Sequence, residues 1–157
     1  NTIFVFVADH VSSETFAPKT LTPTGNTQII CLIYTPDGSL RGVNRSVAQQ
    51  IDLMPTLLGL TGYDRPYFAF GRDVLRETDR EPMVSNYAGG TYQGITDSLV
   101  LFFDGERTLS AYLRSDTLQK NDISGIRTPA LEAAERDLKA RLQQYYRHVK
   151  QKDYLAE

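Results

Sequence analysis

Several residue types that decide the class of a protein are scarce in this chain of 157 residues. It has one cysteine, no tryptophan and two histidines, and its formal net charge is only -2. A single cysteine excludes an internal disulfide framework. The small net charge leaves no broad basic surface, so nucleic acid is not an expected partner.

Long hydrophobic runs are missing as well. The two longest apolar segments, residues 3–8 and 29–34, are far shorter than the ~20 residues of a membrane-spanning helix. We therefore expect no bilayer-crossing helix within these residues. The cysteine, Cys31, lies in the second segment, and its apolar neighbours indicate a small buried side chain rather than a reactive thiol.

The first apolar segment ends at an acid and an imidazole side by side, Asp9 and His10. An apolar run without polar alternation predicts a strand buried on both faces, as in a parallel α/β sheet. Ligands of such sheets bind beyond the carboxyl ends of the strands. A carboxylate oxygen and an imidazole nitrogen can ligate one divalent cation, so Asp9 and His10 are the candidate metal ligands.

A second interpretation of this dipeptide stays open. Neighbouring residues of an ideal strand point to opposite faces, so Asp9 and His10 converge only if the chain bends there. The alternative is a turn acid beside a solvated histidine, with no metal role.

The segment after this dipeptide predicts a loop, a second strand and a short helix. Residues 11–27 are rich in Ser, Thr and Pro, and residues 29–34 form the expected strand. Asp52 is placed to cap a helix over residues 53–60, in which Pro55 fits only in the first turn. Gly62 is expected to end that helix.

Residues 76–82 are rich in charge, and the pattern after them changes to short strands. We therefore expect two domains, residues 1–75 and residues 76–157. Four short strands are predicted, at residues 83–87, 91–96, 99–103 and 106–113, separated by turn signals that include Asp104-Gly105. A closing helix is expected from Thr128, because apolar residues then recur at spacings of three and four. His148, near its end, is expected on the surface. The predicted fold is α/β, an α/β core portion followed by an antiparallel meander packed against a helix.

These elements in this order resemble the sulfatase and alkaline phosphatase superfamily. The resembling segments are residues 4–10, the strand at 30–36, the Gln-Gln-Ile-Asp-Leu-Met-Pro-Thr-Leu-Leu-Gly run at 49–59, and Gly-Arg-Asp-Val-Leu at 71–75. The chain looks most similar to sulfatases related to lipoteichoic acid synthase and to phosphoglycerol transferases. The resemblance implies that Asp9 and His10 ligate a catalytic divalent cation, Mn, Mg, Ca or Zn. For Asp52, Pro55 and Thr56 a structural role is expected instead.

The resemblance also implies that part of the catalytic site lies outside these residues. In such enzymes the nucleophile and the other metal ligands lie in an amino-terminal half, so we expect this chain to be a carboxyl-terminal portion. It would bind metal weakly or not at all and be inactive alone. Its substrate would be a sulfate or phosphate ester, handled at the periplasmic or extracellular face of the cytoplasmic membrane. Val11 stands where many relatives have a glycine.

Two further expectations follow from the residues. The competing class of function is a non-catalytic α/β module that binds a partner or is purely structural. Strand edges without neighbours recruit other chains, so self-association through the first strand or the meander edge is also expected.

Overall fold

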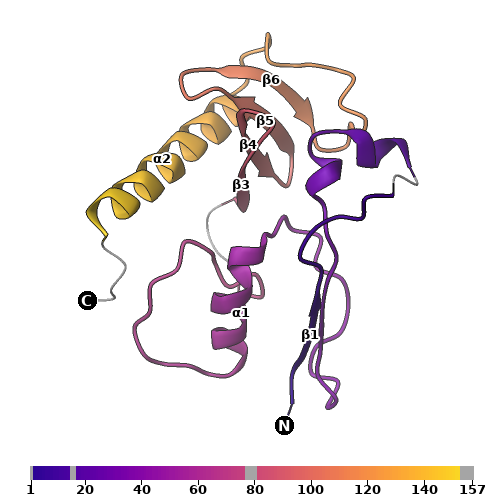
Figure 1. The fold of residues 1–157 in the computed structure, drawn as a ribbon, viewed down its shortest axis with the longest axis vertical. Coiled ribbons are helices and arrows are strands. Elements are labelled where there is room, and N and C mark those ends of the chain that lie inside the picture. Colours follow the sequence, from indigo (N-terminus) through magenta and orange to yellow (C-terminus); the bar gives the residue numbers. More distant parts are fainter. Residues whose placement is uncertain (1, 15–16, 77–80, 153–157) are drawn as a thin grey trace. The chain divides into compact units, whose positions relative to one another are not determined.

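A computed structural model describes residues 2–14, 17–76 and 81–152. These residues form two compact units: residues 1–45 with 116–120, and residues 46–115 with 121–157. The fold mixes helices with antiparallel sheets, which is consistent with the expected α/β class (Figure 1). The expected domain division between residues 75 and 76 stays a prediction, and residues 77–80 of the expected boundary lie outside the described residues.

The first unit is built on a ribbon of two strands, β1 (Phe4–Val7) and β2 (Cys31–Tyr34). They pair antiparallel, with Phe4 opposite Tyr34 and Val7 opposite Cys31. The expected parallel pairing and burial on both faces are wrong for this chain. The 23 residues that connect the strands, as far as they are described, contain only two short 3₁₀ helices, Pro18–Leu21 and Gly25–Thr27. A parallel pair needs a crossover, usually a helix, that also covers one face of the sheet.

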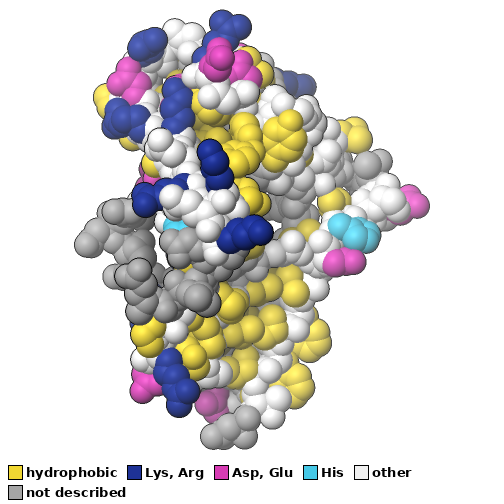
Figure 2. Space-filling view, turned by 60° about the vertical axis from the view of Figure 1, so that its left-hand side comes forward, with side chains coloured by type: hydrophobic (Ala, Val, Ile, Leu, Met, Phe, Trp, Pro, Cys, Tyr) yellow, Lys and Arg dark blue, Asp and Glu magenta, His cyan; other side chains and the backbone are white. Residues whose placement is uncertain are grey.

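The ribbon consequently exposes its apolar side chains. Phe4, Phe6, Leu32 and Tyr34 share one face of it and are between 43% and 58% exposed. Hydrophobic side chains are widely visible on the surface of the molecule (Figure 2). Cys31 is exposed as well, which corrects the expectation of a buried core cysteine. Partial desolvation raises the pKa of its thiol, so little of it is the reactive thiolate.

The second unit contains the expected meander. Its strands are β3 (Met83–Ala88), β4 (Thr91–Thr96), β5 (Leu99–Phe103) and β6 (Thr108–Leu113), each antiparallel to the next. The β5–β6 connection has four residues, 104–107, rather than the tight two-residue turn that Asp104-Gly105 suggested. The Asp104 carboxylate holds that loop by accepting hydrogen bonds from the backbone N–H groups of Glu106 and Arg107, both at 2.8 Å.

The long helix α2 (Pro129–Gln151) covers one face of the meander, as expected (Figure 1). Thr128 caps it by accepting a hydrogen bond from the Leu131 N–H at 3.2 Å. Leu131, Ala134 and Leu138 at the expected spacing are buried against the sheet. The core cluster consists of these three together with Met83, Leu99, Leu101, Phe103 and Ala111.

His148 is not the purely superficial residue that its place near the helix end suggested. Its ring packs against those of Phe68 and Phe70, with centroids 4.8 and 5.8 Å away, and it is half-buried. The aromatic residues after α1 supply this contact, which local helix periodicity does not reveal.

A shorter helix, α1 (Leu53–Leu60), begins where it was expected, with Pro55 in its first turn, and Gly62 follows it with φ +71°. Asp52, however, does not cap α1 through its side chain. Its two oxygens accept hydrogen bonds from the backbone N–H groups of Gln49 (2.9 Å) and Arg72 (2.8 Å). The Gln49 bond is part of a capping box at the 3₁₀ helix η3 (Gln50–Asp52), which leads directly into α1, so the side chain caps η3 rather than α1. The Arg72 bond ties Asp52 to a segment twenty residues later.

Thr56 completes this attachment. Its buried hydroxyl donates to the Asp52 carbonyl at 2.7 Å and accepts from the Val74 N–H at 3.1 Å. Gly71 lies so close to Ile51 that an added Cβ would stand 2.1 Å from its carbonyl oxygen. The residues of the two motifs at 49–59 and 71–75 therefore bind each other, and their role in this structure is to fasten the segment after the helix onto α1.

Candidate metal site

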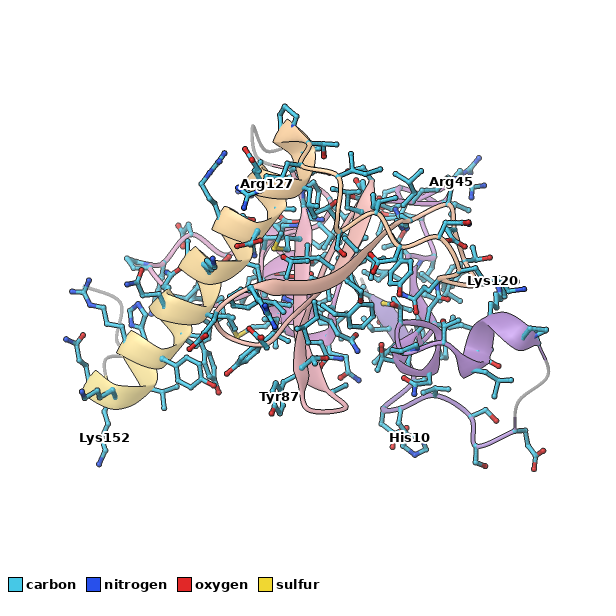
Figure 3. All side chains as sticks on the ribbon, turned by 90° about the horizontal axis from the view of Figure 1, so that it is seen from above. His10, Arg45, Tyr87, Lys120, Arg127 and Lys152 are labelled. Atoms are coloured by element: carbon cyan, nitrogen blue, oxygen red, sulfur yellow. The ribbon has the colours of Figure 1, made fainter. Side chains whose placement is uncertain are left out.

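The candidate ligands lie immediately after β1, where the chain leaves the ribbon. The Ala8 N–H still donates to the Ile30 carbonyl at 3.2 Å, and the backbone then bends at Asp9 and His10. This bend removes the strand alternation that would have sent the two side chains to opposite faces. His10 projects outward from this turn (Figure 3).

The bend brings the carboxylate and the imidazole together. Asp9 Oδ1 accepts a hydrogen bond from the His10 backbone N–H at 2.9 Å, which fixes the carboxylate over its neighbour. Asp9 Oδ2 then lies 3.6 Å from His10 Nε2. The structure therefore brings the two predicted site residues together.

A third group orients the ring. His10 Nδ1 lies 2.8 Å from the Val11 carbonyl oxygen. A carbonyl only accepts, so Nδ1 carries the proton, and in the neutral ring Nε2 keeps its lone pair on the side of Asp9. Metal-binding histidines usually have such a partner on the second nitrogen. The sequence could not identify this partner, because a main-chain carbonyl belongs to every residue.

The surroundings of the pair are open to solvent. The side chains of His10 and Asp9 are 79% and 88% exposed. The hydrogen bond to the Val11 carbonyl, and next the charge of Asp9, raise the pKa of His10. Its imidazole therefore holds a proton more firmly than a free histidine, and a cation at Nε2 has to compete with that proton.

The donor geometry fits two ligands of one ion. Metal–oxygen and metal–nitrogen bonds of about 2.0–2.2 Å place neighbouring donors roughly 3 to 3.5 Å apart. The separation of 3.6 Å between Oδ2 and Nε2 is close to that range. The donor types, one carboxylate and one neutral imidazole nitrogen, suit a divalent transition metal.

Two donors do not complete a site. Among the residues that the structure describes, no group of three or more His, Cys, Asp or Glu side chains could hold a metal ion. Catalytic zinc sites have three protein ligands, and calcium takes six to eight oxygens. The described residues thus bring two candidate donors together, which is fewer than such sites use.

None of the described helices combines the length and the hydrophobicity needed to cross a membrane.

Comparison with known proteins gives one positive result. Residues 1–63 match the family model of sulfatase. This match supports the expected relation to the sulfatase and alkaline phosphatase superfamily over that segment, which contains Asp9, His10 and α1. Neither the curated proteins nor the solved structures contain a match to the chain.

Proposed function

We propose that this chain is part of a metal-dependent enzyme of the sulfatase type, which hydrolyses or transfers a sulfate or phosphate ester. Asp9 and His10 are two ligands of its divalent cation. The observation that carries the proposal is the approach of Asp9 Oδ2 to His10 Nε2, within a segment that matches the sulfatase family.

Each group at the strand end has a distinct role. Asp9 supplies a negative charge and an oxygen donor through Oδ2. Its other oxygen, Oδ1, accepts the hydrogen bond from the His10 N–H. His10 supplies Nε2, and the Val11 carbonyl fixes its tautomer. A bound divalent cation supplies Lewis acidity, which neutralises charge on a sulfuryl or phosphoryl oxygen and lowers the pKa of an alcohol nucleophile.

The remaining parts of the catalyst are assigned to residues outside this chain. We propose that the nucleophile and the other ligands come from an amino-terminal portion of the same protein. The 157-residue chain alone would then bind metal with a dissociation constant on the order of a millimolar and show no turnover. The incomplete donor set among the described residues supports this view.

The finer assignment follows the sequence resemblance. We propose a relation to lipoteichoic acid synthase and phosphoglycerol transferases, and a site of action at the periplasmic or extracellular face of the cytoplasmic membrane. The support for this closer relation is the sequence pattern, an apolar segment followed by Ala-Asp-His and, about forty residues later, by Ile-Asp-Leu-Met-Pro-Thr-Leu-Leu.

Metal binding can be tested on the chain itself. Titration with Mn²⁺, followed by paramagnetic broadening of backbone amide NMR signals, should broaden residues 9–11 first. Asp9→Asn should abolish this selectivity, because it keeps the backbone hydrogen bond but removes the charge. Asp37→Asn, an exposed acid in the same compact unit, and His148→Gln, the other histidine, serve as matched controls and should leave the broadening unchanged.

Two results would contradict the proposal. One is broadening that is equally strong around Asp37 and Asp9, since that indicates a general attraction of cations to exposed acids. The other result comes from a longer polypeptide that carries an amino-terminal portion. There we expect Asp9→Ala and His10→Ala to lower the hydrolysis of nitrophenyl sulfate and nitrophenyl phosphate at least a hundredfold. Unchanged hydrolysis of both esters in these variants would favour the non-catalytic module instead.

A further inference from the structure

The last turns of α2 differ in charge from the rest of the chain. Residues 138–152 contain five lysines and arginines and no aspartate or glutamate, whereas the three acids of the helix all precede them. The first two of these cations form ion pairs with acids one turn earlier in α2. The last three, Arg147, Lys150 and Lys152, have no acidic partner among the residues that the structure describes. The end of α2 is therefore locally basic in a chain whose net charge is -2.

Exposed aromatic and aliphatic side chains lie among these cations. Tyr145, Tyr146 and Val149 are 47%, 52% and 41% exposed. Val149 follows the two tyrosines by one helical turn, so the three side chains are neighbours on the helix surface. Lys150 follows Tyr146 at the same helical spacing. This end of α2 consequently combines an exposed aromatic stripe with positive charge.

The hairpin of β3 and β4 extends the aromatic stripe. The hydroxyls of Tyr92 and Tyr146 are hydrogen-bonded to each other at 2.7 Å, and the Tyr87 ring lies 4.9 Å from the Tyr92 ring between centroids. Residues 83–96 contain no charged residue, and the hairpin turns at Gly89 and Gly90, both with positive φ. Tyr87 is 62% exposed and lies near that turn (Figure 3). The hairpin thus presents an uncharged aromatic end next to the basic end of α2.

These two parts match two layers of an anionic lipid bilayer. Tyrosine is favoured at the boundary between headgroups and acyl chains, because its ring is apolar while its hydroxyl stays hydrated. Lysine and arginine are attracted to anionic headgroups, and their long side chains reach them from the protein surface. A soluble polyanion would be attracted by the cations but has no need of an uncharged aromatic hairpin. The combination therefore favours a lipid surface.

We propose that the second unit docks on an anionic lipid bilayer through Tyr87, Tyr146 and Val149 together with Arg147 and Lys150, which we call the tyrosine surface. The tyrosines and the valine enter the headgroup region, and the two cations contact lipid phosphates. This docking uses residues 83–96 and 138–152 alone. It requires no free end or strand edge of the chain and no bound metal, so it goes beyond the proposed function.

Co-sedimentation with vesicles, in the presence of a metal chelator, tests the contribution of charge. The chain should sediment with vesicles of equal parts phosphatidylglycerol and phosphatidylcholine but not with phosphatidylcholine alone, and added salt should weaken the binding. Arg147→Gln combined with Lys150→Gln should raise the apparent dissociation constant at least tenfold. Arg127→Gln combined with Arg136→Gln removes the same charge from two other exposed cations and should change it less than about twofold. Equal effects of the two double variants, or no binding to the mixed vesicles, overturn the proposal.

The contribution of the aromatic rings is tested against the ribbon. Tyr87→Ser should weaken binding to the mixed vesicles about tenfold. Tyr34→Ser is the matched control, because Tyr34 is 52% exposed on β2 and lies in the other compact unit. An equal loss in Tyr34→Ser would show general adsorption through exposed aromatic residues and overturn the proposal. Binding that neither serine variant alters would favour a soluble polyanion as the partner and also overturn it.

A fluorescent probe tests where the chain touches the bilayer. The chain has no tryptophan, so one introduced tryptophan reports on its own position. Mixed vesicles whose phosphatidylcholine carries brominated acyl chains should quench Tyr87→Trp and leave Tyr34→Trp unchanged. Quenching at position 34 in place of position 87 overturns the proposal.

The same probe shows whether the tyrosine surface is open in a longer polypeptide that carries an amino-terminal portion. Tyr87→Trp should respond to the brominated vesicles there as it does in the chain of 157 residues. Emission that is already shifted to the blue without vesicles, and that vesicles do not change, would mean that another part of the polypeptide covers this surface. That result overturns the docking and leaves the metal site untouched.

Discussion

The ribbon of β1 and β2 and the meander of β3 to β6 have similar apolar sequences but opposite environments. All five residues of β5 in the meander are buried, and its edges are paired on both sides. Leu99, Leu101 and Phe103 belong to the core cluster that β5 forms with α2. In the ribbon, three of the four residues of each strand are exposed. A hydrophobic strand is therefore stabilised only where the chain supplies something to cover it, and the ribbon is where a partner is expected.

The sharpest comparison removes the same side chain from both regions. Leu101 in β5 is fully buried and Leu32 in β2 is 55% exposed. Leu101→Ala should lower the free energy of unfolding by about 2–5 kcal/mol, because it leaves a cavity in the core. Leu32→Ala should change it by less than about 0.5 kcal/mol. Urea unfolding monitored by circular dichroism measures both, and equal effects would mean that the ribbon is covered as well as the meander.

Polar attachment can be compared in the same way. Asp52 is 5% exposed, and its carboxylate accepts two backbone hydrogen bonds. Asp52→Ala leaves both donors without this acceptor and should cost about 2–4 kcal/mol. Asp52→Asn, which keeps the shape and one acceptor oxygen, should cost less. Asp64→Ala is the exposed control in the same unit, and an equal loss in that variant would show that Asp52 is not specifically anchored.

A smaller effect is expected at the start of α2, the helix that distinguishes the meander from the ribbon. Thr128→Ala removes the acceptor of the Leu131 N–H and should destabilise the second unit by about 1 kcal/mol. Thr128→Ser retains a hydroxyl and should restore most of that loss. Thermal unfolding measures the difference, and identical midpoints for the alanine and serine variants would show that the cap contributes nothing.

The smallest effect is a difference in acid sensitivity. The Asp122 carboxylate accepts hydrogen bonds from the backbone N–H groups of Ala111 and Ser124, which lowers its pKa. A carboxyl whose folded pKa lies below its unfolded value stabilises the fold above the unfolded pKa, about 3.9, and this contribution is lost as the pH falls through the folded pKa. Asp122→Asn should therefore flatten the decline in stability of the meander below about pH 5.

Asp37, beside the ribbon, provides the matched control. Its pKa is also lowered, chiefly by the Ser39 N–H, but it belongs to the other compact unit. Asp37→Asn should leave the acid sensitivity of the meander unchanged. Urea midpoints at a series of pH values provide the measurement, and the same pH slope in Asp122→Asn and in the unmodified chain would contradict the assignment.

The sequence predicted the elements better than their surroundings. Turn signals at Ala88-Gly89-Gly90 and Asp97-Ser98 located the meander strands, and spacings of three and four located α2, because both are local patterns. The apolar run of β1 predicted burial on two faces. That burial depends on elements from distant or external segments, which no local pattern specifies.

The candidate site shows the same division. Asp9 and His10 could be selected from residue type and position at a strand end, and the structure brings them together, while their metal role stays a prediction. The function of Asp52 could not be predicted, because its second donor, the Arg72 N–H, is distant in sequence and is a backbone group.

The carbonyl that orients His10 has a consequence for how this region tolerates change. It belongs to the peptide unit of Val11, so replacing the valine side chain by glycine or alanine leaves the acceptor in place. A side-chain substitution scan of residues 9–11 would therefore detect Asp9 and His10 and miss the contribution of the Val11 carbonyl. Exchanging the amide linkage between residues 11 and 12 for an ester, which makes that oxygen a poorer acceptor, would reveal it by loosening the imidazole while every side chain stays the same.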